Sequence, residues 1–466
     1  MPDLSIAETA QRVTDTAISH LALFRSVVIR AHAGAGKTGG RSSGTVRVAA
    51  KAVSSGLRVL LLVAQNDQLA ETTLRLCRDW PAMTTTLIPA TRSWPQAMPG
   101  WITDPRQRPA NLLVADPDSG DGQARNRLQD QPGLFVMTLA KSGYLRGRWS
   151  DTRTGGFIPV DAFDVIIVDE AWMVPASEWR HLQHLGRTFL LIGDPGQIMP
   201  WAPESEYYPG MQGSPIEPLP ELLLRERPGT VELELPVTRR NPSHTTDITG
   251  RLPAYAGSPT RPMFTAAEVP IVPTVARISR EPADPAIDAM LGAGMSLYRL
   301  PGGLAGQDDR LTAAGCASAA ARLLGLGPQL GHPSGTRPLT GDDIAIIVTH
   351  HDQRAAVLRE LAAAGLAGPA QPRVATFNTI QGATVAVTIM WHPLSGREDV
   401  SSFHADAGRL TVGLTRHTHG CLLVSRDGVG DQVAAAPVTG DLEGDAVDLR
   451  YAGLRAHELV WSHLTR

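Results

Sequence analysis

Five short, continuously apolar runs in the amino-terminal part of the chain constrain its fold most strongly. They have the length of β-strands and lie at residues 26–30, 58–64, 134–138, 164–168 and 188–192. Helical stretches lie between them, for example at residues 67–80. Strands that are apolar on both faces and alternate with helices are typical of a parallel sheet that helices cover on both sides. The sequence therefore predicts an α/β protein.

A second alternating block follows and predicts a second α/β domain. Its strands are expected at residues 231–235, 295–300, 343–349, 373–377, 385–391 and 421–425, and its helices at 311–324 and 353–364. We expect the first domain over residues 1–235, the second over 236–430, and a carboxyl-terminal extension of unknown role over 431–466. Residues 80–131 are rich in Pro, Asp and Gly, so we expect an insertion with little regular structure there.

The composition excludes several classes of protein. The 43 basic residues nearly balance the 46 acidic ones, and the net charge of −3 argues against a polybasic tail that binds nucleic acid by bulk charge. The three cysteines, Cys77, Cys316 and Cys421, are too far apart for a zinc motif or a disulfide framework. With no secretory leader and no apolar run of about 18 residues, we expect a cytoplasmic protein without a membrane span.

A glycine-rich motif directly follows the first expected strand. It consists of Ala31, His32, Ala33, Gly34, Ala35, Gly36, Lys37 and Thr38. Small residues between a strand and a helix let consecutive backbone N–H groups point at phosphates. Lys37 is suited to reach the β- and γ-phosphates of ATP, and the Thr38 hydroxyl is suited to bind Mg²⁺. We therefore expect a phosphate-binding loop that opens a helix, with Ala31 small enough for a position where glycine is usual.

Two further expected strands end in polar residues that suit the same chemistry. Asp169 and Glu170 follow the apolar run at 164–168, where a buried acidic pair is costly unless it has a function. Asp169 suits Mg²⁺ binding, and Glu170 suits the base that polarises the attacking water. An acidic N-cap of the next helix is the alternative interpretation. Gln197, in the turn GDPGQ after the run at 188–192, is suited to sense the γ-phosphate.

The order of these motifs resembles that of superfamily 1 helicases. Three later segments match further motifs of the family: LPVTRRNP at residues 235–242, TFNTIQG at 376–382 and VGLTR at 412–416. The match in order and spacing covers about residues 11–425. GDPGQIMP is closer to the branch of 5′-to-3′ enzymes that act on RNA or DNA. Asn378 stands where the family usually has histidine.

This resemblance implies two RecA-like domains with a nucleotide cleft between them. The second domain would supply Arg240 and Arg416 as arginine fingers that stabilise charge during phosphoryl transfer, with Arg239 as the alternative to Arg240. The resemblance also assigns three residues to the nucleotide, namely Gln381, Gly382 and Gln11. Gln11 matches an adenine-reading glutamine of the family, although a glutamine on a helix surface is an equally good interpretation.

The resemblance also implies a single-stranded DNA or RNA partner held mainly through its phosphates. The positions that match the strand-binding residues of the family are Gln65, Asn66, Thr138 and Thr376. Trp201 could stack on a base or pack beneath the proline-rich loop. We therefore expect an ATP-dependent translocase or helicase. The alternative is an ATP-driven conformational switch that acts on a protein partner without unwinding nucleic acid.

Overall fold

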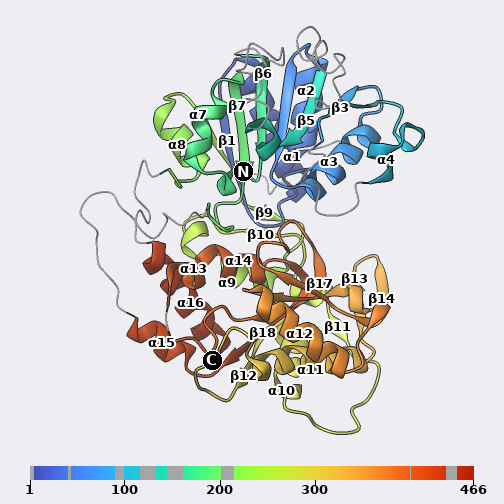
Figure 1. Cartoon of the computed structure of the whole chain (residues 1–466), viewed down its shortest axis with the longest axis vertical. Coiled ribbons are helices and arrows are strands. Elements are labelled where there is room, and N and C mark those ends of the chain that lie inside the picture. The colour runs from blue at the N-terminus through green and yellow to red at the C-terminus, as the bar shows by residue number, and fades with distance from the viewer. Residues whose placement is uncertain are drawn as a thin grey trace.

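The computed structural model describes residues 5–39, 43–89, 99–115, 133–143, 161–200, 215–398, 400–436 and 449–465. These residues form two large parallel β-sheets, each accompanied by helices (Figure 1). The expected α/β class is confirmed. Trp201 lies outside the described residues.

The first sheet has eight parallel strands in the order β4-β3-β5-β2-β6-β7-β1-β8. Their bounds are β1 Val27–Ala31, β2 Arg58–Val63, β3 Thr85–Leu87, β4 Leu112–Val114, β5 Gly133–Thr138, β6 Phe163–Asp169, β7 Gly186–Gly193 and β8 Val231–Leu235. The five apolar runs that start the chain form β1, β2, β5, β6 and β7, which are contiguous in the middle of the sheet. This central place explains why they are apolar on both faces.

The segment at residues 80–131 contributes more regular structure than its composition predicts. Strand β3 pairs with β5, and β4 pairs with β3, so this segment extends one edge of the sheet. A short helix, α4 (Gly100–Thr103), lies between the two strands. The expectation of an insertion with little regular structure was therefore wrong for its described part. Strands of three residues carry too short a pattern to be read from sequence.

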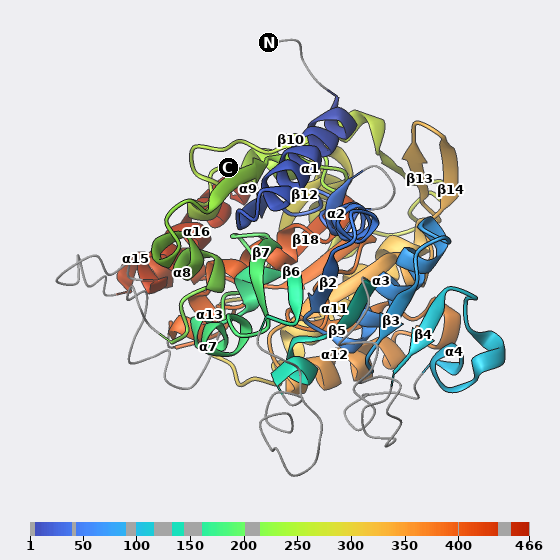
Figure 2. The ribbon, with the colours of Figure 1, turned by 90° about the horizontal axis from the view of Figure 1, so that it is seen from above.

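Helices cover both faces of the first sheet. Their bounds are α1 Ile6–Ala22, α2 Gly44–Ser54, α3 Asn66–Asp79, α7 Trp179–Leu182 and α8 Leu219–Glu226. Alternate residues of each strand point to opposite sides, so Leu61 packs in the core beneath α1, α2 and α3, and Leu60 in the core beneath α7 and α8. In the view from above, α1 and α2 lie on one side of the central strands and α7 on the other (Figure 2).

The second sheet has five parallel strands in the order β12-β18-β17-β15-β16. Their bounds are β12 Met295–Leu300, β15 Ile344–Val348, β16 Arg373–Thr376, β17 Val385–Trp391 and β18 His417–Arg426. One face packs on α10 (Asp284–Ala293), α11 (Arg310–Gly325) and α12 (His351–Ala363). The other packs on α9 (Ser243–Thr249), α14 (Ala407–Leu414) and α16 (Leu449–Leu464). The extension expected at 431–466 thus contains α16, which buries Ala456 and Val460 against this sheet.

Shorter elements complete the described chain. Strand β9 (Val237–Thr238) pairs with β10 (Arg261–Pro262), while β11 (Ile271–Val272), β13 (Gln329–His332) and β14 (Gly335–Pro338) form a small antiparallel sheet. Two further helices, α13 (Ser402–Ala405) and α15 (Val429–Ala435), lie beside α16. Among the described helices, none combines the length and the apolar character needed to cross a bilayer.

Candidate nucleotide site

The loop after β1 has the geometry of an anion-binding nest. Gly34 and Gly36 have φ angles of +76° and +78°, which only glycine adopts without strain. Within the described chain, the N–H groups of Gly34, Gly36, Lys37 and Thr38 have no hydrogen-bond acceptor. Successive N–H groups around left-handed glycines form a concave site for anions such as phosphate. The loop therefore offers four donors that no described residue accepts.

The loop does not open a helix directly, which corrects the expectation from sequence. Helix α2 begins at Gly44, six residues after Thr38. The N–H of Thr45 donates to Lys37 O at 2.9 Å, and the N–H of Val46 donates to Thr38 O at 3.2 Å. Each bond spans eight residues, twice the spacing of an α-helix. The carbonyls of Lys37 and Thr38 thus accept hydrogen bonds from α2 as a preceding helical turn would.

The end of β6 brings two buried carboxylates to this loop. The Thr38 hydroxyl donates to Asp169 Oδ2 at 3.1 Å, and Lys37 Nζ lies 2.8 Å from Glu170 Oε2. Glu170 has a left-handed backbone with φ of 57° and ψ of 41°. Such a conformation is costly for a residue with a side chain and is concentrated at functional sites. Here it occurs at the residue that makes the ion pair with Lys37.

Asp169 is destabilised in its charged form. Burial and the neighbouring charge of Glu170 raise the pKa of Asp169 to about 6, although Lys37 and Thr38 oppose the shift. A carboxylate with this environment gains from a cation beside it. The Asp169 carboxylate and the Thr38 hydroxyl together offer the hard oxygen donors that Mg²⁺ prefers. Across the described chain, no group of three or more His, Cys, Asp or Glu side chains forms a self-sufficient metal site.

The turn after β7 completes the cluster with Gln197. Its amide lies 3.1 Å from Glu170 Oε2 and 3.0 Å from Lys37 Nζ. We assign the nitrogen to the Glu170 side and the oxygen to the Lys37 side, because this orientation satisfies both partners. The ends of β1, β6 and β7 therefore meet in one buried group of three side chains. Adjacent parallel strands bring their carboxyl ends together in this way.

Two arginines from the second domain face this group. Arg416 is 1% exposed, and its guanidinium bonds only to Val412 O at 3.3 Å and to Thr415 Oγ1 at 3.4 Å. Among the described residues, no carboxylate lies within ion-pair distance of Arg416. Arg240 Nη1 donates to Thr415 O at 3.3 Å, and burial together with the charge of Arg416 lowers the pKa of Arg240 to about 9. Two desolvated cations without a carboxylate partner form a strong site for an anion.

Arg239 also lies at the loop, although the sequence favoured Arg240. A Cβ atom at Gly36 would lie 3.5 Å from Arg239 Cδ, and Arg239 Nη2 reaches Ser43 Oγ at 3.5 Å. A Cβ atom at Gly34 would lie 2.5 Å from Thr238 Oγ1. The segment at residues 238–240 thus packs directly on the phosphate loop. The charge of Arg416 contributes to the lowered pKa of Arg240.

The structure does not bring every predicted residue to this cluster. Gln11 is exposed on α1, and its side chain has no hydrogen bond to another described residue. Gln381 and Gly382 follow β16, where a Cβ atom at Gly382 would lie 3.6 Å from Gln68 Nε2 of α3. Both amide atoms of Gln381 are buried without a partner in the described chain. Gly382 thus approaches the first domain at α3.

The four predicted strand-binding residues lie at the ends of β2, β5 and β16. Gln65 is exposed, and Asn66 after it is the first residue of α3. Thr138 and Thr376 are 4% and 7% exposed. Their hydroxyls already serve their own turns, since Thr138 accepts from the Lys141 N–H at 3.2 Å and Thr376 bonds the Thr379 hydroxyl at 3.1 Å. Gln65 is therefore the most accessible of the four.

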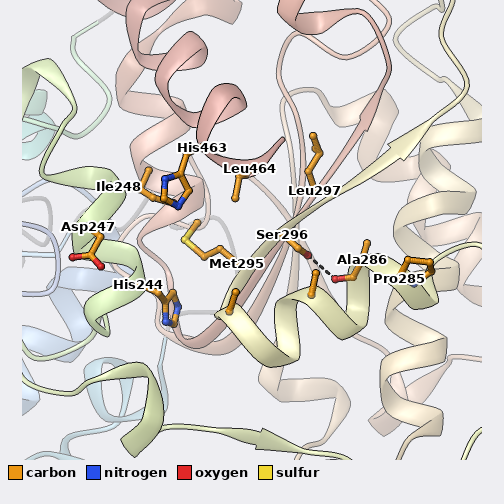
Figure 3. A pocket seen from close by; sticks show the side chains of 12 residues that line it. His244, Asp247, Ile248, Pro285, Ala286, Met295, Ser296, Leu297, His463 and Leu464 are labelled. Carbon is orange, nitrogen blue, oxygen red and sulfur yellow. Dashed lines mark hydrogen bonds between the residues drawn. The ribbon is translucent and has the colours of Figure 1, made fainter. Parts of the chain in front are cut away.

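A pocket of about 500 Å³ lies in the second domain, away from the phosphate loop (Figure 3). Helices α9, α10 and α16 and strand β12 supply its lining, including His244, Met295 and His463. His244 Nε2 lies 3.2 Å from the Nε2 atom of His417, the residue after Arg416. None of the residues that meet at the ends of β1, β6 and β7 lines this pocket.

Topology and strand ends together decide the fold. The phosphate loop, the glutamine turn and the acidic pair follow the adjacent parallel strands β1, β7 and β6, and a second parallel sheet supplies the facing arginines. The described residues thus form two parallel-sheet α/β domains, and the candidate nucleotide site lies between them.

Comparisons with known proteins yield structural matches alone. No family model and no curated protein sequence matches the chain. The PRRSV helicase matches at 13% identity and a TM-score of 0.40, over 88% of this chain and 54% of that one. Arterivirus nonstructural protein 10, a helicase, matches at 13% identity with a TM-score of 0.41, over 88% of this chain and 62% of its own. Dbp5 of S. cerevisiae, bound to RNA and ADP BeF3, matches at 10% identity with a TM-score of 0.43, over 93% of this chain and 83% of its own. The chain thus spans less than two thirds of the viral helicase chains.

The raised pKa of Asp169 predicts a pH-dependent cost to stability in metal-free protein. Its carboxyl holds a proton up to about pH 6 when folded, but its ordinary pKa is 3.8. Between about pH 4 and pH 6 the folded protein binds this proton more tightly than the unfolded chain does. The free energy of unfolding therefore falls as pH rises through this range. We expect Asp169→Asn to be more stable than the unsubstituted protein at pH 7.5, by on the order of 1–3 kcal/mol, and equally stable near pH 4. Urea unfolding in EDTA measures this difference.

Asp308→Asn provides the matched control, since Asp308 is exposed in a turn before α11. We expect this variant to follow the unsubstituted protein at every pH. If Asp169→Asn were destabilising at pH 7.5, the electrostatic account of this strand end would be wrong.

Proposed function

We propose that the chain is an ATPase that moves along a single strand of DNA or RNA or unwinds a duplex. The proposal rests on the group of Lys37, Glu170 and Gln197. Beside it lie four N–H donors that no described residue accepts, and opposite it lies the guanidinium of Arg416, which has no carboxylate partner among the described residues. Few ligands other than a polyphosphate match such a set of donors and cations. The order of motifs in the sequence supports ATP hydrolysis coupled to nucleic acid.

The free N–H groups of the loop support binding of the ATP phosphates. Lys37 would contact the β- and γ-phosphates, while Thr38 and Asp169 would hold Mg²⁺. When bound, Mg²⁺ would supply positive charge to the phosphate oxygens. The 3.1 Å contact between the Thr38 hydroxyl and Asp169 Oδ2 supports this assignment, because both oxygens lie within reach of one small cation. Gln11 remains a proposal for the adenine ring.

The Lys37–Glu170 ion pair suggests how binding prepares hydrolysis. Without nucleotide, Lys37 neutralises Glu170 at 2.8 Å. A γ-phosphate would compete for Lys37, and Glu170 would then accept a proton from the attacking water. Gln197 bonds to both side chains, so its amide would keep Glu170 and the water aligned. Arg416 and Arg240 would stabilise the charge that develops on the transferred phosphoryl group.

Contacts between the domains support coupling to a mechanical step. Residues 238–240 pack on the phosphate loop, and Gly382 of the second domain lies beside Gln68 of α3. Changes in the nucleotide would thus shift the second domain against α3, whose first turn carries Asn66. A strand held by Gln65, Asn66, Thr138 and Thr376 would then move relative to one domain in each cycle. Gln381, whose amide has no partner among the described residues, would link the strand surface to the nucleotide.

The proposal predicts that Glu170→Gln separates ATP binding from hydrolysis. The amide keeps the shape of the carboxylate but cannot accept the proton, so kcat should fall by about 100-fold or more while ATP still binds. Lys37→Ala should lose binding as well. Steady-state phosphate release and nucleotide binding measure the two effects. Glu226→Gln, at the exposed end of α8, is the matched control and should hydrolyse ATP normally. Unchanged turnover in Glu170→Gln would remove the proposed base.

The proposal also predicts that single-stranded DNA or RNA raises ATP turnover at least severalfold. A strand that contacts both domains would favour the arrangement in which Arg416 and Gln197 meet the γ-phosphate. Because the contacts are mainly to phosphate, the stimulation should depend little on base sequence and should weaken as salt rises. Phosphate release against oligonucleotide length and salt measures it. A flat response to every strand would instead favour the ATP-driven switch that acts on a protein partner.

A further inference from the structure

Tyr255 joins the two domains at the candidate nucleotide site, although it belongs to none of the sequence motifs. It ends a short 3₁₀ helix, Pro253–Tyr255, in the segment between α9 and β10. Its side chain is 2% exposed and packs in the core of the second domain with Leu252, Phe377 and Leu410. The centroid of its ring also lies 4.6 Å from that of the His32 ring in the phosphate loop of the first domain.

The Tyr255 hydroxyl binds the turn that carries Gln197. It donates to Asp194 Oδ1 at 2.7 Å, and the N–H of Gly196 donates to the same oxygen at 2.9 Å. Asp194 is 1% exposed, so this carboxylate depends on its donors inside the protein. Burial and the charge of Asp194 raise the pKa of Tyr255 well above its usual range, which keeps the hydroxyl a donor.

The turn leaves room for this hydroxyl only because residue 196 is glycine. A Cβ atom at Gly196 would lie 2.5 Å from both Cζ and Oη of Tyr255. On its other side the turn touches α14, where a Cβ atom at Gly408 would collide with the carbonyl of Gln197. The backbone of Gln197 is thus confined between Tyr255 and α14. Its amide, in turn, contacts Lys37 and Glu170.

We propose that Tyr255 is a positioning residue for hydrolysis, which holds Gln197 against Lys37 and Glu170 through its hydrogen bond to Asp194. The inference rests on the proposed ATPase function. Tyr255 touches neither Lys37 nor Glu170, so it acts through the turn. Binding of ATP depends mainly on the loop N–H groups and Lys37, whereas the alignment of Gln197 affects the chemical step. Loss of the hydroxyl should therefore lower kcat and leave KM for ATP nearly unchanged.

Tyr255→Phe tests this role, because it removes the hydroxyl and keeps the ring. We expect kcat to fall about tenfold with KM for ATP within about threefold, the effect of losing one hydrogen bond to a buried charge. Tyr298→Phe is the matched control, since Tyr298 is buried in β12 within a separate core and should keep normal kinetics. If Tyr255→Phe does not fold, Gly196→Ala replaces it, because its methyl group displaces the same hydroxyl.

A double-mutant cycle with Asp194→Asn distinguishes positioning from a general weakening of the fold. If Tyr255 acts through Asp194, kcat of the double variant should be no lower than that of the more impaired single variant. Additive losses, or normal kcat in Tyr255→Phe, would overturn the inference while leaving ATP hydrolysis by the unsubstituted protein intact. Absence of any ATPase activity in the unsubstituted protein would instead overturn the proposed function, and this inference with it.

Discussion

The buried ion pair between Lys37 and Glu170 is the interaction on which the rest of the candidate site depends. The two side chains are each about 10% exposed and lie 2.8 Å apart. A buried charge that loses its partner costs about 3–5 kcal/mol, so the pair fixes the end of β6 against the phosphate loop. Gln197 bonds to both members and adds the end of β7. The order of strands in the first sheet makes this meeting possible, because β7 lies between β1 and β6.

The second domain adds charges that the protein alone does not neutralise. Arg416 is buried without a carboxylate partner in the described chain, and burial together with the charge of Arg416 lowers the pKa of Arg240. Asp169 is the acidic counterpart, since its pKa is raised. Each group costs stability in the free protein and would gain when a phosphate or a metal ion is bound. Buried charges that lower the stability of the free protein in this way are concentrated at functional sites.

The sequence was sufficient to predict the sheet and the residues at its strand ends, because both are encoded locally. The apolar runs at β1, β2, β5, β6 and β7 indicate strands that are buried on both faces. Small or polar residues directly after some of them indicate the candidate nucleotide site. The start of α2 at Gly44 was not predictable, since it depends on hydrogen bonds from Thr45 and Val46 to Lys37 and Thr38, eight residues earlier. Strands β3 and β4 were missed because three residues carry no clear period.

Tertiary contacts explain what else the sequence did not reveal. Tyr255 stands in a proline-rich segment with no motif around it, and only the fold brings its hydroxyl to Asp194. Arg239 and Arg240 are adjacent in sequence, and only packing distinguishes their surroundings. The hydroxyls of Thr138 and Thr376 form hydrogen bonds within their own turns, and the motif positions alone do not show this.

We propose that a cation from the second domain completes an ATP site on the first, and Arg416→Ala tests this arrangement most directly. The substitution removes a guanidinium that pairs with no described carboxylate, so it leaves no buried anion behind. The measurement is kcat of ATP hydrolysis beside the Kd for ATP, with Arg416→Lys in parallel. We expect kcat to fall by about 100-fold or more and the Kd to change by less than about threefold, with poor rescue by lysine, which lacks the planar fork. Normal hydrolysis by Arg416→Ala would contradict the two-domain site.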